Sequence, residues 1–170
     1  YNISPEMLLP QTMPYNDNTI DEMLSQQIDL SMLPDAKVAR TPNGALFRTK
    51  KQGFLPEMMQ EMYNDRTIYK KKMLTAKQQY EDTKDPKFLN DVSRFQNIQM
   101  ARKISLNSAY GAIGNEWFRY YDLKIAEGIT TSGQLSIRWI EKALNGYLNK
   151  LLKSAGVDYV IASHTDSLYI

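Results

Sequence analysis

Residues 54–114 contain two long helix-forming runs with a single break between them. The first run covers about Pro56 to Tyr80 and is rich in Met, Glu, Gln and Lys, which are good helix formers. The second covers about Lys87 to Ala112, after a break at residues 81–86 that ends in a proline, which a helix interior does not tolerate. We predict an antiparallel helical hairpin, whose arms of about 26 residues would each be roughly 39 Å long.

Residues 1–53 contain signals for short elements only. Ser4 followed by Pro5 is typical of a helix start, with serine as the N-cap. Thr19-Ile20-Asp21-Glu22 is typical of a capping box at the start of a second short helix. Residues 38–40 and 45–47 are candidate strands, and the Asn-Gly pair between them favours a tight hairpin turn.

A third helix is expected from about Thr130 to Lys153, because apolar residues recur there at three- and four-residue spacing. Residues 157–162 then alternate as a strand does, and residues 168–170 begin a second strand after a polar turn. The chain is therefore expected to be α+β. Its domains would be 1–53, 54–112 and 113–170, with the helical hairpin inserted in the middle.

Composition excludes several kinds of site. The 170 residues carry a net charge of +2 and no cysteine, so disulfides and cysteine-based zinc sites are excluded. No apolar run approaches the roughly 20 residues that a membrane helix needs, so no membrane contact is expected. The chain lacks an initiator Met and stops within a strand pattern, from which we expect an internal segment of a longer protein.

The second long helix places chemically distinct residues on one face. At 100° per residue, Lys103, Asn107, Tyr110 and Gly111 fall within about a third of the helix circumference. A cation, an amide, an aromatic ring and a bare backbone would thus project in the same direction.

The first long helix carries Arg66 and Lys70 four residues apart, on a shared face. Folding the hairpin about its break brings Arg66 level with Lys103, so these three cations could converge on one anion, with Asn107 just beyond. Arginine offers a fork to phosphate and lysine a point charge, as a triphosphate requires. The alternative is a solvated basic surface, which is the usual state of lysines such as those at 70–72.

Asp166 is expected near the tip of the terminal β-hairpin. A carboxylate held between two strands is suited to Mg²⁺, which prefers oxygen ligands, and pairs of such ions assist phosphoryl transfer. Aspartate is also an ordinary turn residue, so a purely structural role remains open.

These stretches resemble family B DNA polymerases, and in particular those of T-even-type, cyanophage-like bacteriophages. Residues 103–115 resemble the second polymerase motif, in which Lys, Asn, Tyr and Gly recur at this spacing. Thr165-Asp166-Ser167 resembles the third motif, usually Asp-Thr-Asp-Ser. Four other stretches resemble the phage branch, namely residues 2–6, 41–44, 117–123 and 129–134.

The resemblance implies a role for each matched residue. Arg66, Lys70 and Lys103 would bind the phosphates of the incoming nucleotide, assisted by Asn107. Tyr110 and Gly111 would lie beside the nascent base pair and the template, and Asp166 would ligate both catalytic Mg²⁺ ions. Residues 54–112 would be the fingers, and the flanking stretches would be parts of the palm.

The resemblance also has departures. The first motif, which holds another metal-binding aspartate, would precede Tyr1, and His164 stands where the third motif usually has its first Asp. The exonuclease and thumb regions have no counterpart in these residues. We therefore expect the chain alone to be inactive.

The longer protein would extend a primer on template DNA with deoxynucleoside triphosphates and Mg²⁺, in the cytoplasm of an infected bacterium. Replication accessory proteins are further candidate partners. Two alternatives stay open. One is a non-catalytic DNA-binding or structural subunit derived from a polymerase, and the other is an unrelated helical-hairpin interaction module.

Overall fold

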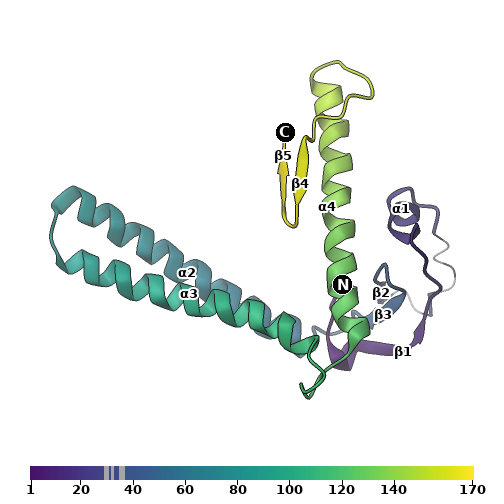
Figure 1. Cartoon of the computed structure of the whole chain (residues 1–170), viewed down its shortest axis with the longest axis horizontal. Coiled ribbons are helices and arrows are strands. Elements are labelled where there is room, and N and C mark those ends of the chain that lie inside the picture. The colour runs from purple at the N-terminus through teal and green to yellow at the C-terminus, as the bar shows by residue number, and fades with distance from the viewer. Residues whose placement is uncertain (29–30, 32, 35–36) are drawn as a thin grey trace. The chain divides into compact units, whose positions relative to one another are not determined.

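The computed structural model describes residues 1–28, 31, 33–34 and 37–170. They form two compact units, one made of residues 1–51 and 123–170 and the other of residues 52–122. Figure 1 shows the elements of both units along the chain. Within the described ranges, none of the helices combines the length and apolar character needed to span a bilayer.

The unit of residues 52–122 is the predicted helical hairpin. Helix α2 covers Phe54–Thr83 and helix α3 covers Lys87–Ile113, and the two run antiparallel (Figure 1). Lys84 ends α2 in the left-handed conformation, with φ 55°, and its N–H donates to Tyr80 O at 2.8 Å. The Asp85 carboxylate accepts from the N–H of Lys87 at 3.0 Å. The break is therefore shorter than predicted, because residues 81–83 are still helical.

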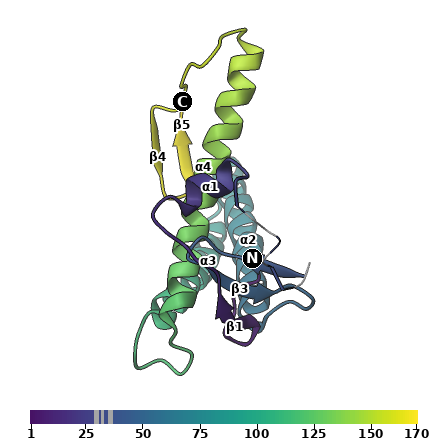
Figure 2. The same cartoon turned by 90° about the vertical axis from the view of Figure 1, so that its right-hand side faces the viewer.

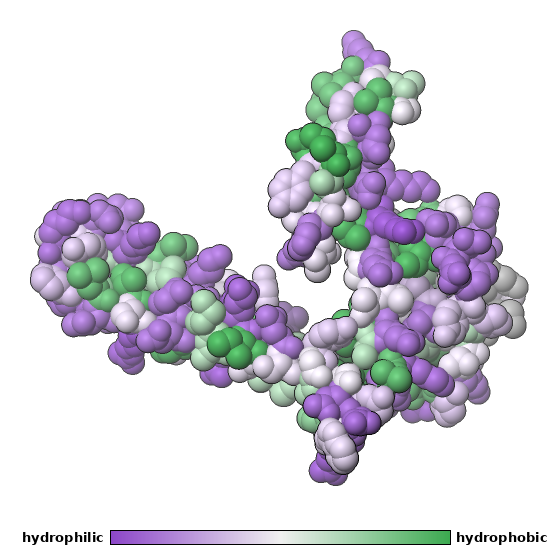
Figure 3. All heavy atoms as spheres, viewed as in Figure 1, coloured by the Kyte–Doolittle hydropathy of each residue, from purple (hydrophilic) through white to green (hydrophobic). Residues whose placement is uncertain are grey.

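The two arms contact each other along a narrow apolar seam. The rings of Tyr69 and Phe95 lie 6.1 Å apart between their centroids, and Ala76 and Gln99 are buried. Gln99 satisfies its amide by donating to Gln96 at 2.9 Å. In Figure 3 the arm is largely hydrophilic, with small hydrophobic areas. Most charged side chains on the hairpin are therefore accessible to a ligand.

The unit of residues 1–51 and 123–170 contains a three-stranded antiparallel sheet in the order β1-β3-β2. Its strands are β1 Leu8–Thr12, β2 Val38–Arg40 and β3 Ala45–Arg48. Leu46 and Phe47 on the central strand are almost fully buried and form the core of this unit. Strand β1 was not predicted, because Pro10 interrupts its pattern and such residues favour edge positions.

The predicted turn between β2 and β3 is confirmed. The N–H of Gly44 donates to Thr41 O at 2.9 Å, and Gly44 has φ 75°. A Cβ at Gly44 would lie 2.1 Å from the carbonyl oxygen of Met13, so only glycine fits this position.

The two predicted helix starts near the N-terminus are corrected in detail. Ser4 precedes a short 3₁₀ helix, η1 Pro5–Met7, but its hydroxyl donates to Glu6 at 2.6 Å and does not cap the backbone. Helix α1 covers Thr19–Leu24, and the Thr19 hydroxyl accepts from the N–H of Asn16, outside the helix. The capping-box prediction was therefore wrong, because the loop before α1 competes for that hydroxyl.

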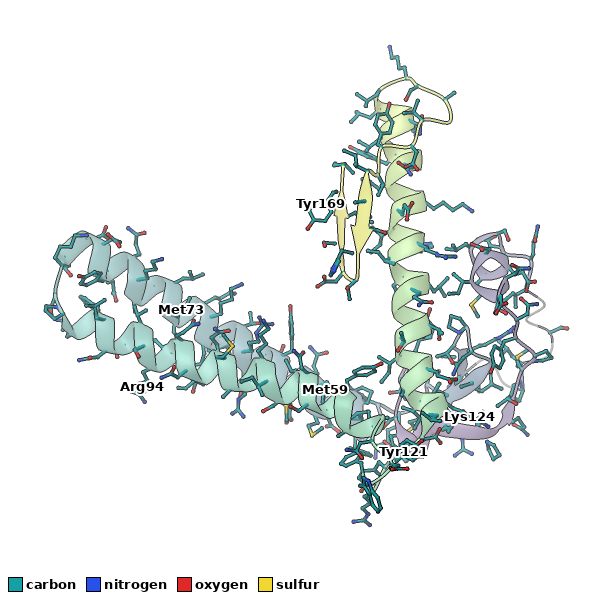
Figure 4. All side chains as sticks on the ribbon, viewed as in Figure 1. Met59, Met73, Arg94, Tyr121, Lys124 and Tyr169 are labelled. Carbon is teal, nitrogen blue, oxygen red and sulfur yellow. The ribbon has the colours of Figure 1, made fainter. Side chains whose placement is uncertain are left out.

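Helix α4 covers Leu123–Leu151 and begins well before the predicted Thr130. Its first turns are stabilised by tertiary contacts: Ile125 is fully buried, and Asn43 Nδ2 donates to the carbonyl oxygen of Lys124 at 2.9 Å (Figure 4 labels Lys124). Gly128 lies close to the β2–β3 turn, where an added Cβ would meet Thr41 at 3.5 Å. The sequence obscured this start because glycine weakens a helical pattern.

The C-terminal strands are β4 Ala162–His164 and β5 Ser167–Tyr169, which pair antiparallel. Both lie alongside α4 in Figures 1 and 2. The predicted strand over residues 157–162 was wrong except at Ala162, because the backbones of Val157 and Tyr159 bind side chains of α4. Ile161, just before β4, donates its N–H to Tyr169 O at 2.8 Å.

Candidate functional site

An ion pair fixes the register of the helical hairpin at the candidate phosphate site. Asp65 Oδ2 on α2 lies 3.1 Å from Arg102 Nη2 on α3. Arg66 and Lys103 follow these two residues in sequence, so their backbones differ by only about 3 Å in level along the hairpin. The predicted cluster requires Arg66 and Lys103 to lie at about the same level of the hairpin, and the register agrees with this. That their side chains converge on one anion stays a prediction.

The cations of α2 differ in their surroundings. Lys70 is exposed, as are the lysines at 71 and 72. Arg66 is half-buried, and its Nε is buried without a hydrogen-bond partner among the residues described. Arg66 therefore has a fixed stem and an unused donor, whereas Lys70 is free to move toward a ligand.

The predicted face of α3 is open. Lys103, Asn107 and Gly111 are exposed, and Tyr110 is 47% exposed. No described atom lies within 4 Å of the position that a Cβ on Gly111 would take. Nothing in the described chain therefore requires glycine at position 111, which leaves room for a ligand to approach the backbone.

Asp166 lies in the two-residue turn between β4 and β5, next to Thr165. Thr165 has φ 45°, which is unusual for a β-branched residue, and the N–H of Asp166 donates back to His164 O. This tight turn presents the exposed Asp166 side chain at the tip of the hairpin, as predicted. His164 is the last residue of β4 and not a turn residue, and its Nδ1 lies 3.3 Å from the Thr165 hydroxyl.

The candidate metal ligands are few. Among the described residues no group of three or more His, Asp or Glu side chains could hold a metal ion. Asp166 fits one oxygen ligand of Mg²⁺, and His164 adds only a nitrogen donor nearby. The role of Asp166 as a metal ligand therefore stays a prediction.

Two asparagines on α4 hold the segment that leads to this hairpin, and the sequence reasoning missed them. Asn149 exchanges hydrogen bonds with the backbone of Val157, at 2.7 and 3.1 Å. Asn145 Oδ1 accepts from the N–H of Tyr159 at 2.9 Å, and Asn145 Nδ2 donates to Asp158 at 2.8 Å. The available signal was two weak helix formers four residues apart on a strongly amphipathic helix.

Comparison with known proteins identifies the family. The model of DNA polymerase family B matches residues 1–170. The DNA-directed DNA polymerase of Escherichia phage RB69 is 30% identical over 214 residues, covering 99% of this chain and 23% of the relative. That of Enterobacteria phage T4 is 29% identical over 210 residues, with the same coverage.

A plant relative matches less of the chain. The DNA polymerase delta catalytic subunit of Arabidopsis thaliana is 30% identical over 143 residues, covering 81% of this chain and 12% of the relative. The chain spans 23% of the length of each phage relative. The predicted resemblance is confirmed over the whole chain, and an unrelated interaction module is excluded. The chain belongs to DNA polymerase family B.

Proposed function

We propose that the protein to which this chain belongs is a DNA-directed DNA polymerase that adds deoxynucleotides to a primer 3′ end. The observation that carries this proposal is the family match over all 170 residues, which includes both motif-bearing segments. In this reaction the primer 3′-hydroxyl attacks the α-phosphate of the nucleotide in line, and pyrophosphate leaves.

The helical hairpin would be the fingers and would bind the triphosphate. Arg66 offers the planar fork of its guanidinium, while Lys70 and Lys103 offer mobile point charges. Asn107 lies one turn beyond Lys103 on α3 and could donate to a phosphate oxygen. These groups would neutralise the triphosphate and orient its α-phosphate toward the primer.

Tyr110 and Gly111 would face the nascent base pair. The exposed Tyr110 ring is suited to contact with a base, because aromatic faces stack on any base. The open space around Gly111 would let the template backbone approach α3 closely. Lys103, Asn107 and these two residues follow one another along a single helix, so base pair and triphosphate would be sensed together.

Asp166 would act as a ligand of the two catalytic Mg²⁺ ions, with the remaining ligands from outside the described residues. Such ions, when bound, stabilise charge on the attacking and leaving oxygens. The tight turn at Thr165 fixes where the carboxylate is presented. The partners would be primer-template DNA and deoxynucleoside triphosphates, together with replication accessory proteins. The setting would be the cytoplasm of an infected bacterial cell.

Primer extension tests the proposal. The full-length protein that carries this chain should extend a primer with Mg²⁺ and all four nucleotides, and Asp166→Ala should nearly abolish extension. Asp82→Ala, which removes an exposed carboxylate on α2, is the matched control and should leave extension intact. The 170-residue chain alone should not extend a primer, because its described residues offer only part of a metal site.

The same assay distinguishes a polymerase from the alternative of a non-catalytic subunit. A full-length protein that binds primer-template DNA but does not extend it, whether or not Asp166 is replaced, would be a non-catalytic DNA-binding or structural subunit derived from a polymerase. Extension by the isolated chain would show that the site is complete without further ligands.

A further inference from the structure

The ion pair between Asp65 and Arg102 lies directly beside two residues of the proposed phosphate site. It is the only ion pair that joins α2 to α3 within the part of the chain that the structure describes. Asp65 precedes Arg66 in α2, and Arg102 precedes Lys103 in α3. The pair therefore connects the two helices at the level where the nucleotide phosphates would bind.

A carboxylate is an unfavourable neighbour for a triphosphate. Asp65 and Arg66 are consecutive, with Cα atoms about 3.8 Å apart, and charges within roughly 8 Å of each other are screened only in part at physiological salt. An unpaired Asp65 would offset much of the attraction that Arg66 and Lys103 provide. With Arg102 at 3.1 Å, the two charges cancel and the phosphates meet a neutral pair.

Arg102 already uses its guanidinium in the ion pair with Asp65. Its Nε is buried and has no hydrogen-bond partner among the described residues, which places the base of the guanidinium inside the hairpin. Its side chain is 42% exposed and that of Asp65 is 47% exposed. Such a partly exposed pair contributes little to stability, so its main effect would be on the local charge.

We propose that Arg102 is a positioning residue that neutralises Asp65 and thereby protects nucleotide binding at Arg66 and Lys103. The inference rests on the proposed polymerase function. This role differs in one testable respect from that of a cation that binds phosphate directly. Removing Arg102 should weaken nucleotide binding because it leaves the Asp65 charge unpaired. Nucleotide binding should therefore recover when Asp65 is also made neutral.

Single-turnover primer extension by the full-length polymerase tests this dependence. Arg102→Ala should raise the apparent nucleotide Kd about two- to fivefold, with an unchanged maximal rate and unchanged affinity for primer-template. Asp65→Asn alone should leave the nucleotide Kd unchanged or lower it. Asp65→Asn combined with Arg102→Ala should restore the normal value, and Arg102→Lys should largely preserve it. Arg94→Ala on α3, labelled in Figure 4, is the control for loss of an exposed cation and should have no effect.

The outcomes separate the two proposals. If Arg66→Ala and Lys103→Ala weaken nucleotide binding but Arg102→Ala does not, the charge-neutralising role is wrong while the polymerase assignment stands. An Arg102→Ala defect that persists in the double variant would assign Arg102 to direct phosphate binding and would also overturn the inference. If the full-length protein does not bind nucleotide at all, the proposed function fails and the inference fails with it.

Discussion

Asn149 and Val157 exchange two hydrogen bonds in the way that residues of neighbouring strands do. Asn149 Nδ2 donates to the carbonyl oxygen of Val157 at 2.7 Å, and the N–H of Val157 donates to Asn149 Oδ1 at 3.1 Å. Asn145 Oδ1 likewise accepts a hydrogen bond from the N–H of Tyr159, at 2.9 Å. Four residues of helix span about 6.0 Å and two of strand about 6.6 Å, so the spacings match. The edge of α4 thus anchors the segment that leads to Asp166.

Replacing Asn149 should therefore loosen this segment. Asn149→Ala removes both hydrogen bonds to Val157 and should lower the free energy of unfolding by about 1–2 kcal/mol. Amide hydrogen exchange should accelerate at Val157 and Tyr159 before it does in α2 and α3. Urea unfolding and exchange measured on the same sample check both effects. Lys150→Ala, an exposed neighbour, is the control, and an equal loss there would remove the specific role of Asn149.

Nucleotide binding should depend on the cations of the hairpin. In the full-length polymerase, Lys103→Ala removes a charge-assisted hydrogen bond to phosphate, worth roughly 1.5–3 kcal/mol, and should lower efficiency about tenfold to over a hundredfold. Arg66→Ala should act similarly, because a guanidinium offers a two-pronged donor to phosphate. Affinity for primer-template without nucleotide should stay unchanged. Normal nucleotide dependence of single-turnover extension in both variants would show that these residues do not bind the triphosphate.

His164 should set the metal requirement of the polymerase. An imidazole never carries the negative charge that an aspartate would bring to this position. His164→Asp should lower the Mg²⁺ concentration needed for half-maximal extension, while Mn²⁺, which accepts imidazole more readily, should help the unmodified protein more. Metal titrations check this, with Ser163→Asp as the control for an added charge. Equal Mg²⁺ midpoints with and without His164→Asp would show that the residue does not tune the metal site.

The β2–β3 turn should tolerate only glycine at position 44. Gly44→Ala places a Cβ against the Met13 carbonyl oxygen in a left-handed residue, and the conformation alone costs about 1–2 kcal/mol. Gly133→Ala is the matched control, because no atom lies within 4 Å of its added Cβ and alanine favours a helix by about 0.5–1 kcal/mol. Urea denaturation should therefore shift in opposite directions for the two variants. A shift in the same direction would contradict the turn geometry.

The tip of the helical hairpin should loosen in acid. A hydrogen bond from Lys84 lowers the pKa of Glu81, and hydrogen bonds from Lys87 lower the pKa of Asp85. A carboxyl whose pKa is lower in the folded state stabilises the fold above its ordinary pKa, and this contribution is lost as the pH falls through the lowered value. The protection factor of the Lys87 amide against hydrogen exchange should therefore fall below about pH 4. Asp85→Asn should remove its share of this dependence, and an unchanged acid response would show that the contact is not formed.

Local patterns were sufficient where the chain makes its own contacts. The start of α3 follows from Asp85-Pro86, and the β2–β3 turn follows from Asn43-Gly44, because each feature is decided by neighbours in sequence. The elements that failed depend on distant partners. Helix α4 begins at Leu123 because Gly128 packs against Thr41, which no helical propensity expresses.

The residues of the candidate site also differ in whether their neighbours in sequence decide their positions. The position of Asp166 in a turn could be predicted, since polar residues between two apolar stretches favour a turn. The ion pair of Asp65 with Arg102 could not, because both residues look like ordinary surface charges until the register of the hairpin is known. The cations of the proposed phosphate site were thus visible in the sequence, and the ion pair beside them was not.

Among the described residues, the polar contacts of the connection between α2 and α3 all lie within residues 80–89, and the connection is largely exposed. Chain length can therefore change there without breaking any distant contact. Seven residues added to each arm would move the tip outward by about 10.5 Å and rotate it by only about 20°. The hairpin is in this sense a modular arm, whose length can change separately from the residues around Arg66 and Lys103.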